Sequence, residues 1–115
     1  MRYVCLVYLE EAMLGGLSAS DKQALDRSSL AYDEELKGRG HLIVAHALEP
    51  IASATTIRVR DGRMSATDGP FAETKEVLGG FILIDARDLN EAIRIAANIP
   101  LAKLGSIEVR PTMEF

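Results

Sequence analysis

Residues 67–80, TDGPFAETKEVLGG, combine a sharp turn with a dense group of ionisable side chains. Asp68 can hydrogen-bond to the backbone ahead of it, Gly69 permits dihedral angles closed to other residues, and Pro70 fixes φ and removes a donor. The chain is therefore expected to leave a strand abruptly after Asp68. The pair Gly79-Gly80 opens an apolar run, where glycines mark a β-bulge or a close approach to the backbone. We expect this stretch to form the site that the rest of the chain supports.

A β-hairpin is predicted directly before this stretch. The dipeptide Asp61-Gly62, a strong signal for a two-residue hairpin turn, lies between two strand-like runs, residues 55–60 and 63–67. The register of such a turn sets Thr55 opposite Asp68. The hairpin therefore presents Asp68 at the end away from its own turn, where a side chain is held more rigidly than on a free loop.

The hydrophobic pattern predicts four further strands and two helices, with a loop over residues 10–17. Each helix is expected to begin at a capping box, formed by Ser20 with Gln23 and by Asp88 with Glu91. The predicted strands cover residues 2–9, 41–48, 78–85 and 106–115, and the predicted helices cover residues 21–37 and 88–98.

This order, β-α-β, a hairpin and again β-α-β, predicts an α+β fold of the split βαβ kind with an inserted hairpin. One antiparallel sheet is expected to carry both helices on one face. The strand over residues 2–9 is apolar on both sides, and the sequence supplies no third helix for the second face of the sheet. We therefore expect a homodimer that forms through the sheet face.

Three segments of the chain resemble the DGPF group of YCII-related proteins. They are residues 67–76 with the glycine pair at 79–80, residues 54–62 before them, and residues 105–111. The resemblance spans nearly the whole chain at compatible spacing. It implies a ferredoxin-like α+β fold that dimerises into an α/β barrel.

The resemblance implies less about activity. Most relatives have no established reaction, some are thought to use a His/Asp pair, and one branch is linked to dehydrochlorination. Genes of DGPF relatives are often neighbours of sigma-factor genes, which implies a regulatory setting. The predicted helices of this chain carry no histidine, so a helix-borne His/Asp pair is not expected here.

Length and charge limit the class of protein. A chain of 115 residues predicts a single domain over residues 1–115, with a core but little room for a deep private pocket. A pocket shared between two subunits is therefore expected. The net charge of −4 and the absence of a basic run argue against nucleic acid as a partner.

The single cysteine and the short apolar runs indicate in which cellular compartment the protein is expected. Cys5 has no second cysteine to form an internal disulfide with, and its apolar neighbours predict a buried side chain. The apolar run over residues 3–9 is too short for a transmembrane helix or a convincing signal peptide. We expect a cytoplasmic protein that does not enter a membrane.

No metal or organic cofactor is expected. His41 and His46 fall on opposite faces of the strand predicted over residues 41–48, so they cannot bind one metal ion together. The sequence also lacks a dinucleotide fingerprint, a phosphate loop and a nucleophile elbow.

Asp68 is the first candidate for a general acid or base, because a carboxylate beside an apolar side chain such as Phe71 can exchange protons near neutral pH. The alternative is that Asp68 merely stabilises the turn before Gly69. His46 is the second catalytic candidate, against the alternative of a core histidine. Solvation or packing is the alternative for the expected substrate-binding residues, which are Phe71, Glu73, Lys75, Tyr8 and Tyr32.

Three hypotheses about function follow. The first is a small enzyme without cofactor, which uses a carboxylate for acid/base chemistry on a small polar organic substrate. The second is a non-catalytic ligand-binding or accessory module in a sigma-factor-linked regulatory pathway, as the resemblance implies. The third is a dimerisation scaffold without a ligand.

Overall fold

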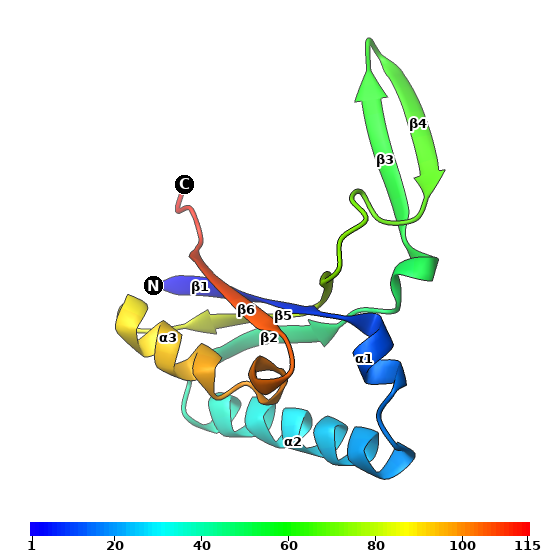
Figure 1. Cartoon of the computed structure of the whole chain (residues 1–115). Helices are drawn as coiled ribbons and strands as arrows, with labels where there is room; N and C mark the ends of the chain where they lie inside the picture. The colour runs from blue at the N-terminus through cyan, green and yellow to red at the C-terminus, as the bar shows by residue number, and fades with distance from the viewer.

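The computed structural model describes residues 1–115, which fold into a four-stranded sheet, a separate two-stranded ribbon and three α-helices (Figure 1). Two 3-10 helices complete the chain. The elements in chain order are β1 (Arg2–Leu9), α1 (Glu11–Gly15), α2 (Ala19–Gly38), β2 (Leu42–Ala47), η1 (Ile51–Ser53), β3 (Thr55–Arg60), β4 (Arg63–Asp68), β5 (Val77–Asp85), α3 (Leu89–Ala97), η2 (Pro100–Lys103) and β6 (Ser106–Pro111).

The main sheet has the strand order β2-β5-β1-β6, and every neighbouring pair is antiparallel. This is the ferredoxin-like arrangement, with β1 in the centre as its continuous apolar sequence predicts. Along β1, alternate side chains are buried, and Tyr3, Cys5, Val7 and Leu9 form the buried set. The predicted fold class, an antiparallel sheet with two helices on one face, is confirmed.

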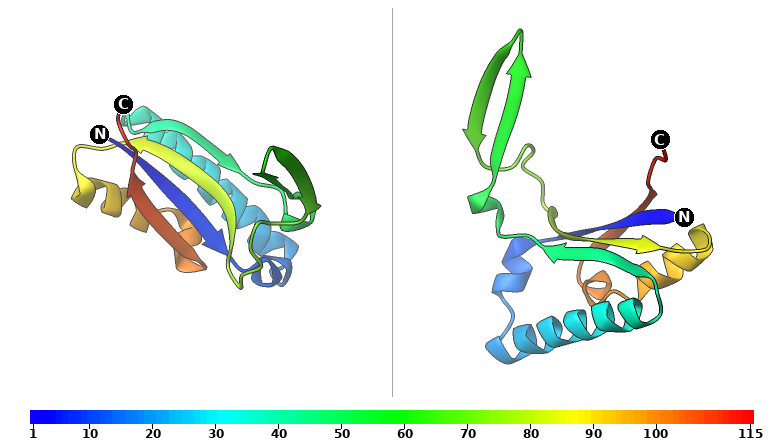
Figure 2. Two further views of the ribbon diagram at one scale, coloured as in Figure 1. Left: turned by 90° about the horizontal axis from the view of Figure 1, so that it is seen from above. Right: turned by 180° about the vertical axis from the view of Figure 1, so that it is seen from behind.

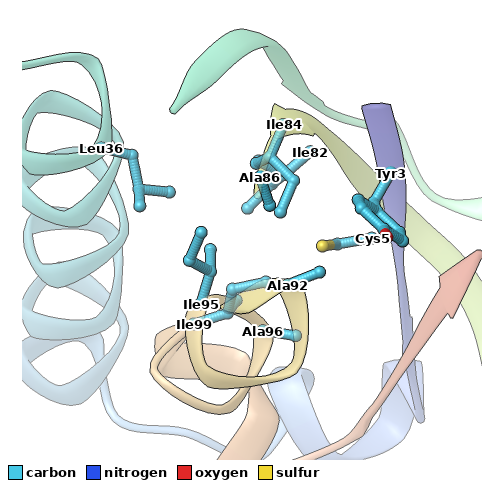
Figure 3. Close-up of a cluster of buried hydrophobic side chains, with 10 residues drawn as sticks. All are labelled: Tyr3, Cys5, Leu36, Ile82, Ile84, Ala86, Ala92, Ile95, Ala96 and Ile99. Atoms are coloured by element: carbon cyan, nitrogen blue, oxygen red, sulfur yellow. The ribbon is translucent and has the colours of Figure 1, made fainter. Parts of the chain in front are cut away.

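Helices α2 and α3 lie on the same face of the sheet, and the core fills the space between them (Figures 1 and 3). Leu36 from α2 and Ile84 from β5 are fully buried there. Cys5 is also buried, as predicted, and burial raises the pKa of its thiol to about 11. The core cluster comprises Tyr3, Cys5, Leu36, Ile82, Ile84, Ala86, Ala92, Ile95, Ala96 and Ile99.

The two helix starts differ in how well they could be predicted. The Asp88 carboxylate accepts a hydrogen bond from the backbone N–H of Glu91 at 2.9 Å, so this expected capping box is confirmed. The cap of α2 is Ser18, whose hydroxyl oxygen accepts from the backbone N–H of Asp21 at 3.0 Å. The expected cap at Ser20 is wrong by about half a turn, because Ser18, two residues earlier, offers the same three-residue spacing, to Asp21.

Two further boundaries differ from expectation. The predicted loop over residues 10–17 contains the short helix α1, and the Glu11 carboxylate accepts a hydrogen bond from the backbone N–H of Ile51 at 2.9 Å. The last strand ends at Pro111 instead of Phe115, because its partner strand β1 begins at Arg2 and offers no further backbone to pair with.

Strand β2 has an irregularity that the strict alternation of faces predicted for residues 41–48, which sets His41 and His46 on opposite faces, does not include. The pairing with β5 shifts between Leu42 and Val44, so Leu42 and Ala45 both pack against the core. A bulge of this kind re-aims the side chains that follow it. His46 then pairs with Phe81, and the two ring centroids lie 5.9 Å apart.

The glycine pair Gly79-Gly80 marks a β-bulge and a close approach, as predicted. Val7 pairs with Gly80 but Tyr8 pairs with Leu78, which leaves Gly79 as the extra residue. A Cβ atom on Gly80 would lie 3.0 Å from the carbonyl oxygen of His46, so a side chain would press on the neighbouring strand.

The predicted hairpin forms the ribbon β3–β4, and its register is the one expected, from Arg60 opposite Arg63 to Thr55 opposite Asp68. Both turn residues, Asp61 and Gly62, have positive φ, as a type I′ turn requires. The ribbon pairs with no strand of the main sheet, and it rises from the side opposite the helices (Figures 1 and 2).

No helix in the structure has both the length and the apolar character needed to span a bilayer.

Candidate ligand-binding site

A cavity of about 550 Å³ lies between α2 and the sheet. Its sheet wall is formed by residues 45–47 of β2, residues 79–82 of β5, and Val7 and Leu9 of β1, and η2 closes one side. The lining residues are Val7, Leu9, Leu14, Lys22, Leu25, Asp26, Ser29, Leu30, Tyr32, Asp33, Ala45, His46, Ala47, Leu48, Gly79, Gly80, Phe81, Ile82, Ile99, Pro100 and Leu101.

The cavity exists because small residues face each other across it. Gly80 brings no side chain to the sheet wall, and Ala45 and Ala47 bring only a methyl group, whereas the space that a side chain on Gly79 would take is filled by Leu9. On the helix side, Ser29 near the middle of α2 brings only a small polar side chain. Since protein interiors are otherwise packed to crystal-like density, space of this size is a candidate binding site.

Polar groups enter the cavity from α2. Lys22, Asp26, Ser29 and Asp33 follow one another at spacings of four, three and four residues, which places them on one side of the helix. Asp33 is half-buried, whereas Lys22 and Asp26 are exposed. The cavity therefore has apolar walls with a polar stripe along α2.

Among the carboxyl groups that line the cavity, Asp33 has an altered pKa. Burial raises its pKa above the ordinary value of an aspartate, and the negative charge of Glu34 raises it further. A carboxyl group in such surroundings gives up its proton less readily than one in water and is a better base when ionised. Asp33 can therefore exchange protons with a ligand in the cavity.

Tyr32 lies beside Asp33, and its hydroxyl donates a hydrogen bond to the carbonyl oxygen of Ile95 at 2.7 Å. Burial is the main cause that raises the pKa of this phenol, with the charge of Glu35 as a second cause. The bond to Ile95 ties α2 to α3 and leaves the Tyr32 oxygen able to accept a further hydrogen bond.

The structure separates the site residues that the sequence suggested into three places. Tyr32 and His46 are both among the residues around the cavity, but the ring of His46 points away from it, to the open face of the sheet, where it lies with Phe81. Tyr8 is half-buried on that open face, because the side chains on either side of it in β1, Val7 and Leu9, are buried on the helix face.

The remaining four, Asp68, Phe71, Glu73 and Lys75, are exposed at the foot of the ribbon and in the loop that follows. The turn there is held by backbone, since the N–H of Gly69 donates to the carbonyl oxygen of Ala54 at 2.7 Å. None of these four side chains borders the cavity.

The loop over residues 69–76 is tied to the sheet by two polar contacts. The Lys75 ammonium lies 3.5 Å from the carboxylate of Glu10. The Ser106 hydroxyl donates to the Glu76 carboxylate at 3.1 Å. These contacts bring the loop to the end of β1, where Glu10 is half-buried and the other three side chains are exposed.

Sequence reasoning missed Asp33, which is one of several charged side chains on this helix. The signal that could have found it is the polar stripe of Lys22, Asp26, Ser29 and Asp33 next to the apolar stripe. A polar stripe at helical spacing does not by itself distinguish a cavity wall from a surface, because the distinction depends on what the sheet presents opposite it.

The fold and the cavity together define a ferredoxin-like α+β protein with a ligand-sized space between the sheet and its longer helix. The chain belongs to the family of the YCII-related domain, whose model matches residues 1–115. It is 37% identical over 113 residues to an uncharacterised protein of Rhizobium meliloti (strain 1021), covering 96% of this chain and 91% of that protein.

A solved structure with a similar fold is the 5-chloro-2-hydroxyhydroquinone dehydrochlorinase of Burkholderia phenoliruptrix AC1100, in complex with 2,5-dihydroxybenzoquinone. The TM-score is 0.58, the sequence identity is 18%, and the match covers 100% of this chain and 96% of that chain. At this identity the similarity establishes the fold and not the reaction.

Proposed function

We propose that the protein binds a small organic molecule in the cavity between α2 and the sheet, and that Asp33 is the acid/base group of that site. The observation that carries the proposal is a half-buried carboxyl group, with a raised pKa, on the wall of a cavity of about 550 Å³. Ligand sites usually combine apolar walls with a few polar groups in a volume of this order.

The chemistry of the walls suggests the class of ligand. The sheet wall around Gly80 is apolar, with Leu9, Ala45 and Ile82 among its residues, which suits a ring or a short hydrocarbon skeleton. Asp33 and Ser29 on the opposite side can bind a hydroxyl or carbonyl group of the same molecule. We propose proton transfer to or from such a group, a step that needs no cofactor.

A non-catalytic ligand-binding or accessory module is the alternative within this proposal. Such a module would bind a ligand in the same cavity without converting it. The association with sigma-factor genes, which the family resemblance implies, favours a regulatory setting. A cytoplasmic location is part of both versions.

An acid/base role for Asp68 with His46, assisted by Glu73 and Lys75, remains a second proposal. It requires that another subunit enclose the foot of the ribbon, because these side chains are exposed in one chain or lie on the open face of the sheet.

The assembly that we propose is a homodimer through the open face of the sheet, closing into an α/β barrel. The chain exposes 8105 Å², whereas a compact monomer of this size exposes about 6,200 Å². The excess of about 1,900 Å² per chain matches what a subunit buries in an obligate homodimer.

The binding site is tested with two probes, 2,5-dihydroxybenzoquinone and the amphiphilic anionic dye anilinonaphthalene sulfonate, by calorimetry and fluorescence. Ser29→Leu fills the cavity and should weaken binding of a probe at least tenfold, since it places a side chain in the ligand's volume. Asp33→Asn should keep the affinity within a few-fold while removing its dependence on pH.

Two matched variants complete this test. Glu34→Gln removes the exposed negative charge next to Asp33, so it should keep the affinity at neutral pH and move the pH dependence of binding to lower pH. Asp68→Asn should leave binding unchanged if Asp33 is the acid/base group. The cavity proposal is refuted if Ser29→Leu binds both probes like the wild type, and loss of binding in Asp68→Asn alone would support the second proposal.

A further inference from the structure

The ribbon β3–β4 is amphipathic although it stands clear of the rest of the chain. Its register places Ile57, Val59 and Met64 on one face, and these side chains are 56%, 58% and 66% exposed. Arg58 lies on the other face of the ribbon, opposite Ser65. An alternation of this kind is the pattern of a strand pair with one buried face.

A two-stranded ribbon without further cover is marginally stable in water. Three large apolar side chains on one face of such a ribbon therefore indicate that another surface covers them. Within the chain, the ribbon pairs with no other strand, and no buried residue lies between Leu36 and Val77. The cover has to come from outside the chain.

The position of the ribbon identifies the second copy as the cover. Figures 1 and 2 show the ribbon rising on the side of the sheet that the helices leave open. A second copy seated on that open face therefore lies beside the ribbon. By two-fold symmetry, the ribbon of the second copy lies beside the first chain in the same way.

The amount of surface supports the same conclusion. Four strands about 4.8 Å apart, each about eight residues long at about 3.3 Å per residue, give a sheet face of about 500 Å². This is a minor part of the excess of about 1,900 Å² that the chain exposes. The radius of gyration, 15.9 Å, also exceeds the value of about 13 Å for a compact domain of this length. The ribbon is the element that extends the molecule.

We propose that the ribbon is a dimerisation arm whose apolar face, formed by Ile57, Val59 and Met64, packs on the second copy of the chain. The arginine face stays in solvent. The inference rests on the proposed homodimer and is independent of the chemistry in the cavity. It also explains why Asp68 and Phe71, at the foot of the arm, are exposed in one chain: docking of the arm brings them to the subunit boundary.

The test compares substitutions on the two faces of the arm. Val59→Ser combined with Met64→Ser should raise the dissociation constant of the dimer at least a hundredfold, because each lost apolar contact counts twice in a symmetric dimer. Arg58→Ser combined with Ser65→Ala changes the opposite face and should alter the constant by less than threefold. Sedimentation velocity over a dilution series measures both.

A second measurement protects the test against misfolding of the arm. An environment-sensitive dye is attached to the single variant Val59→Cys or Arg58→Cys, since the native Cys5 is buried. The emission of the dye at position 59 should shift to the blue as the protein concentration rises, and the emission at position 58 should not change.

The outcomes separate the possible errors. A wild-type protein that is monomeric at all concentrations overturns the homodimer and the arm together, without affecting binding of a ligand in the cavity. A wild-type dimer whose dissociation constant does not respond to Val59→Ser with Met64→Ser, and whose dye at position 59 stays in water, refutes the arm alone.

Discussion

The four-stranded sheet with its helices and the segment over residues 48–76, which connects β2 to β5, differ in how much of their side-chain surface is buried within the chain. All 14 buried residues belong to the first region, and residues 48–76 contain none. Yet residues 48–76 hold most of the distinctive sequence, including the hairpin turn, the Gly69-Pro70 corner and the group of charged side chains.

The difference teaches that distinctive sequence and packing within one chain are separate properties. In the sheet region, the identity of a residue is explained by its neighbours in the core. In residues 48–76, contacts within the chain explain the turns but do not cover the apolar face of the ribbon or Phe71. The proposed subunit boundary would cover both.

The largest expected effect tests this contrast directly. Ile84→Ala removes a fully buried side chain and should lower the free energy of unfolding by about 2–5 kcal/mol, because it leaves a cavity in the core. The same change in the ribbon, Ile57→Ala, should cost less than about 0.5 kcal/mol in the monomer. Urea unfolding followed by circular dichroism measures both.

Protein concentration separates the two changes further. The cost of Ile84→Ala should persist at every protein concentration, whereas the cost of Ile57→Ala should grow as the dimer becomes populated. An equal cost for Ile57→Ala in dilute and concentrated protein would mean that its role lies within the chain, and the contrast between the regions would be lost.

Glycines give a smaller effect with a different cause in each region. A Cβ atom on Gly105 would clash with the carbonyl oxygen of Tyr8, so Gly105→Ala should cost about 1–3 kcal/mol through displacement of the backbone. Gly69 has open space around it but a φ of 107°, so Gly69→Ala should cost about 1–2 kcal/mol through strain in one residue.

The control for both glycine variants is Gly15→Ala, at the end of α1, where a Cβ atom meets nothing within 4 Å. Alanine has the higher helix propensity, so this change should be neutral or stabilising. Crystal structures should show movement of β1 against β6 in Gly105→Ala and an altered turn alone in Gly69→Ala. A rigid-body shift of the ribbon in Gly105→Ala would show that the two regions are mechanically coupled.

The fold could be predicted from the sequence wherever the signal is local. The Asp61-Gly62 turn fixes the register of the ribbon, Asp88 and Glu91 fix the start of α3, and the apolar run of β1 fixes the central strand. The errors lie where two local signals compete or where pairing decides. Ser18 competes with Ser20 as a cap, and the bulge in β2 depends on its pairing with β5.

The cavity could not be predicted in the same way. Its walls come from α2, β2, β5 and η2, which are far apart in the sequence. Asp33 looks like any exposed acidic residue until the glycines of β5 are placed opposite it. The residues that attracted attention in the sequence, such as Asp68 and Lys75, have unusual neighbours along the chain, whereas Asp33 has unusual neighbours in space.

The smallest expected effect concerns this difference between Asp33 and an exposed carboxylate of the same helix. Burial and the charge of Glu34 raise the pKa of Asp33 in the folded protein, so folding opposes its ionisation. Stability from the protonated form is fully present below the pKa of the unfolded chain, about 3.9, and is lost as the pH rises through the folded pKa. The Asp33→Asn variant cannot ionise at this position, so it does not lose this stability as the pH rises.

The melting temperature of Asp33→Asn should therefore equal that of the wild type near pH 3 and exceed it slightly at pH 7. Asp26→Asn is the matched control, because Asp26 borders the same cavity from the same helix with its side chain exposed. Its melting temperature should follow the wild type across the whole range of pH. If both variants gain equally at pH 7, the gain comes from reducing the negative charge of the chain, and Asp33 then has no special place on the cavity wall.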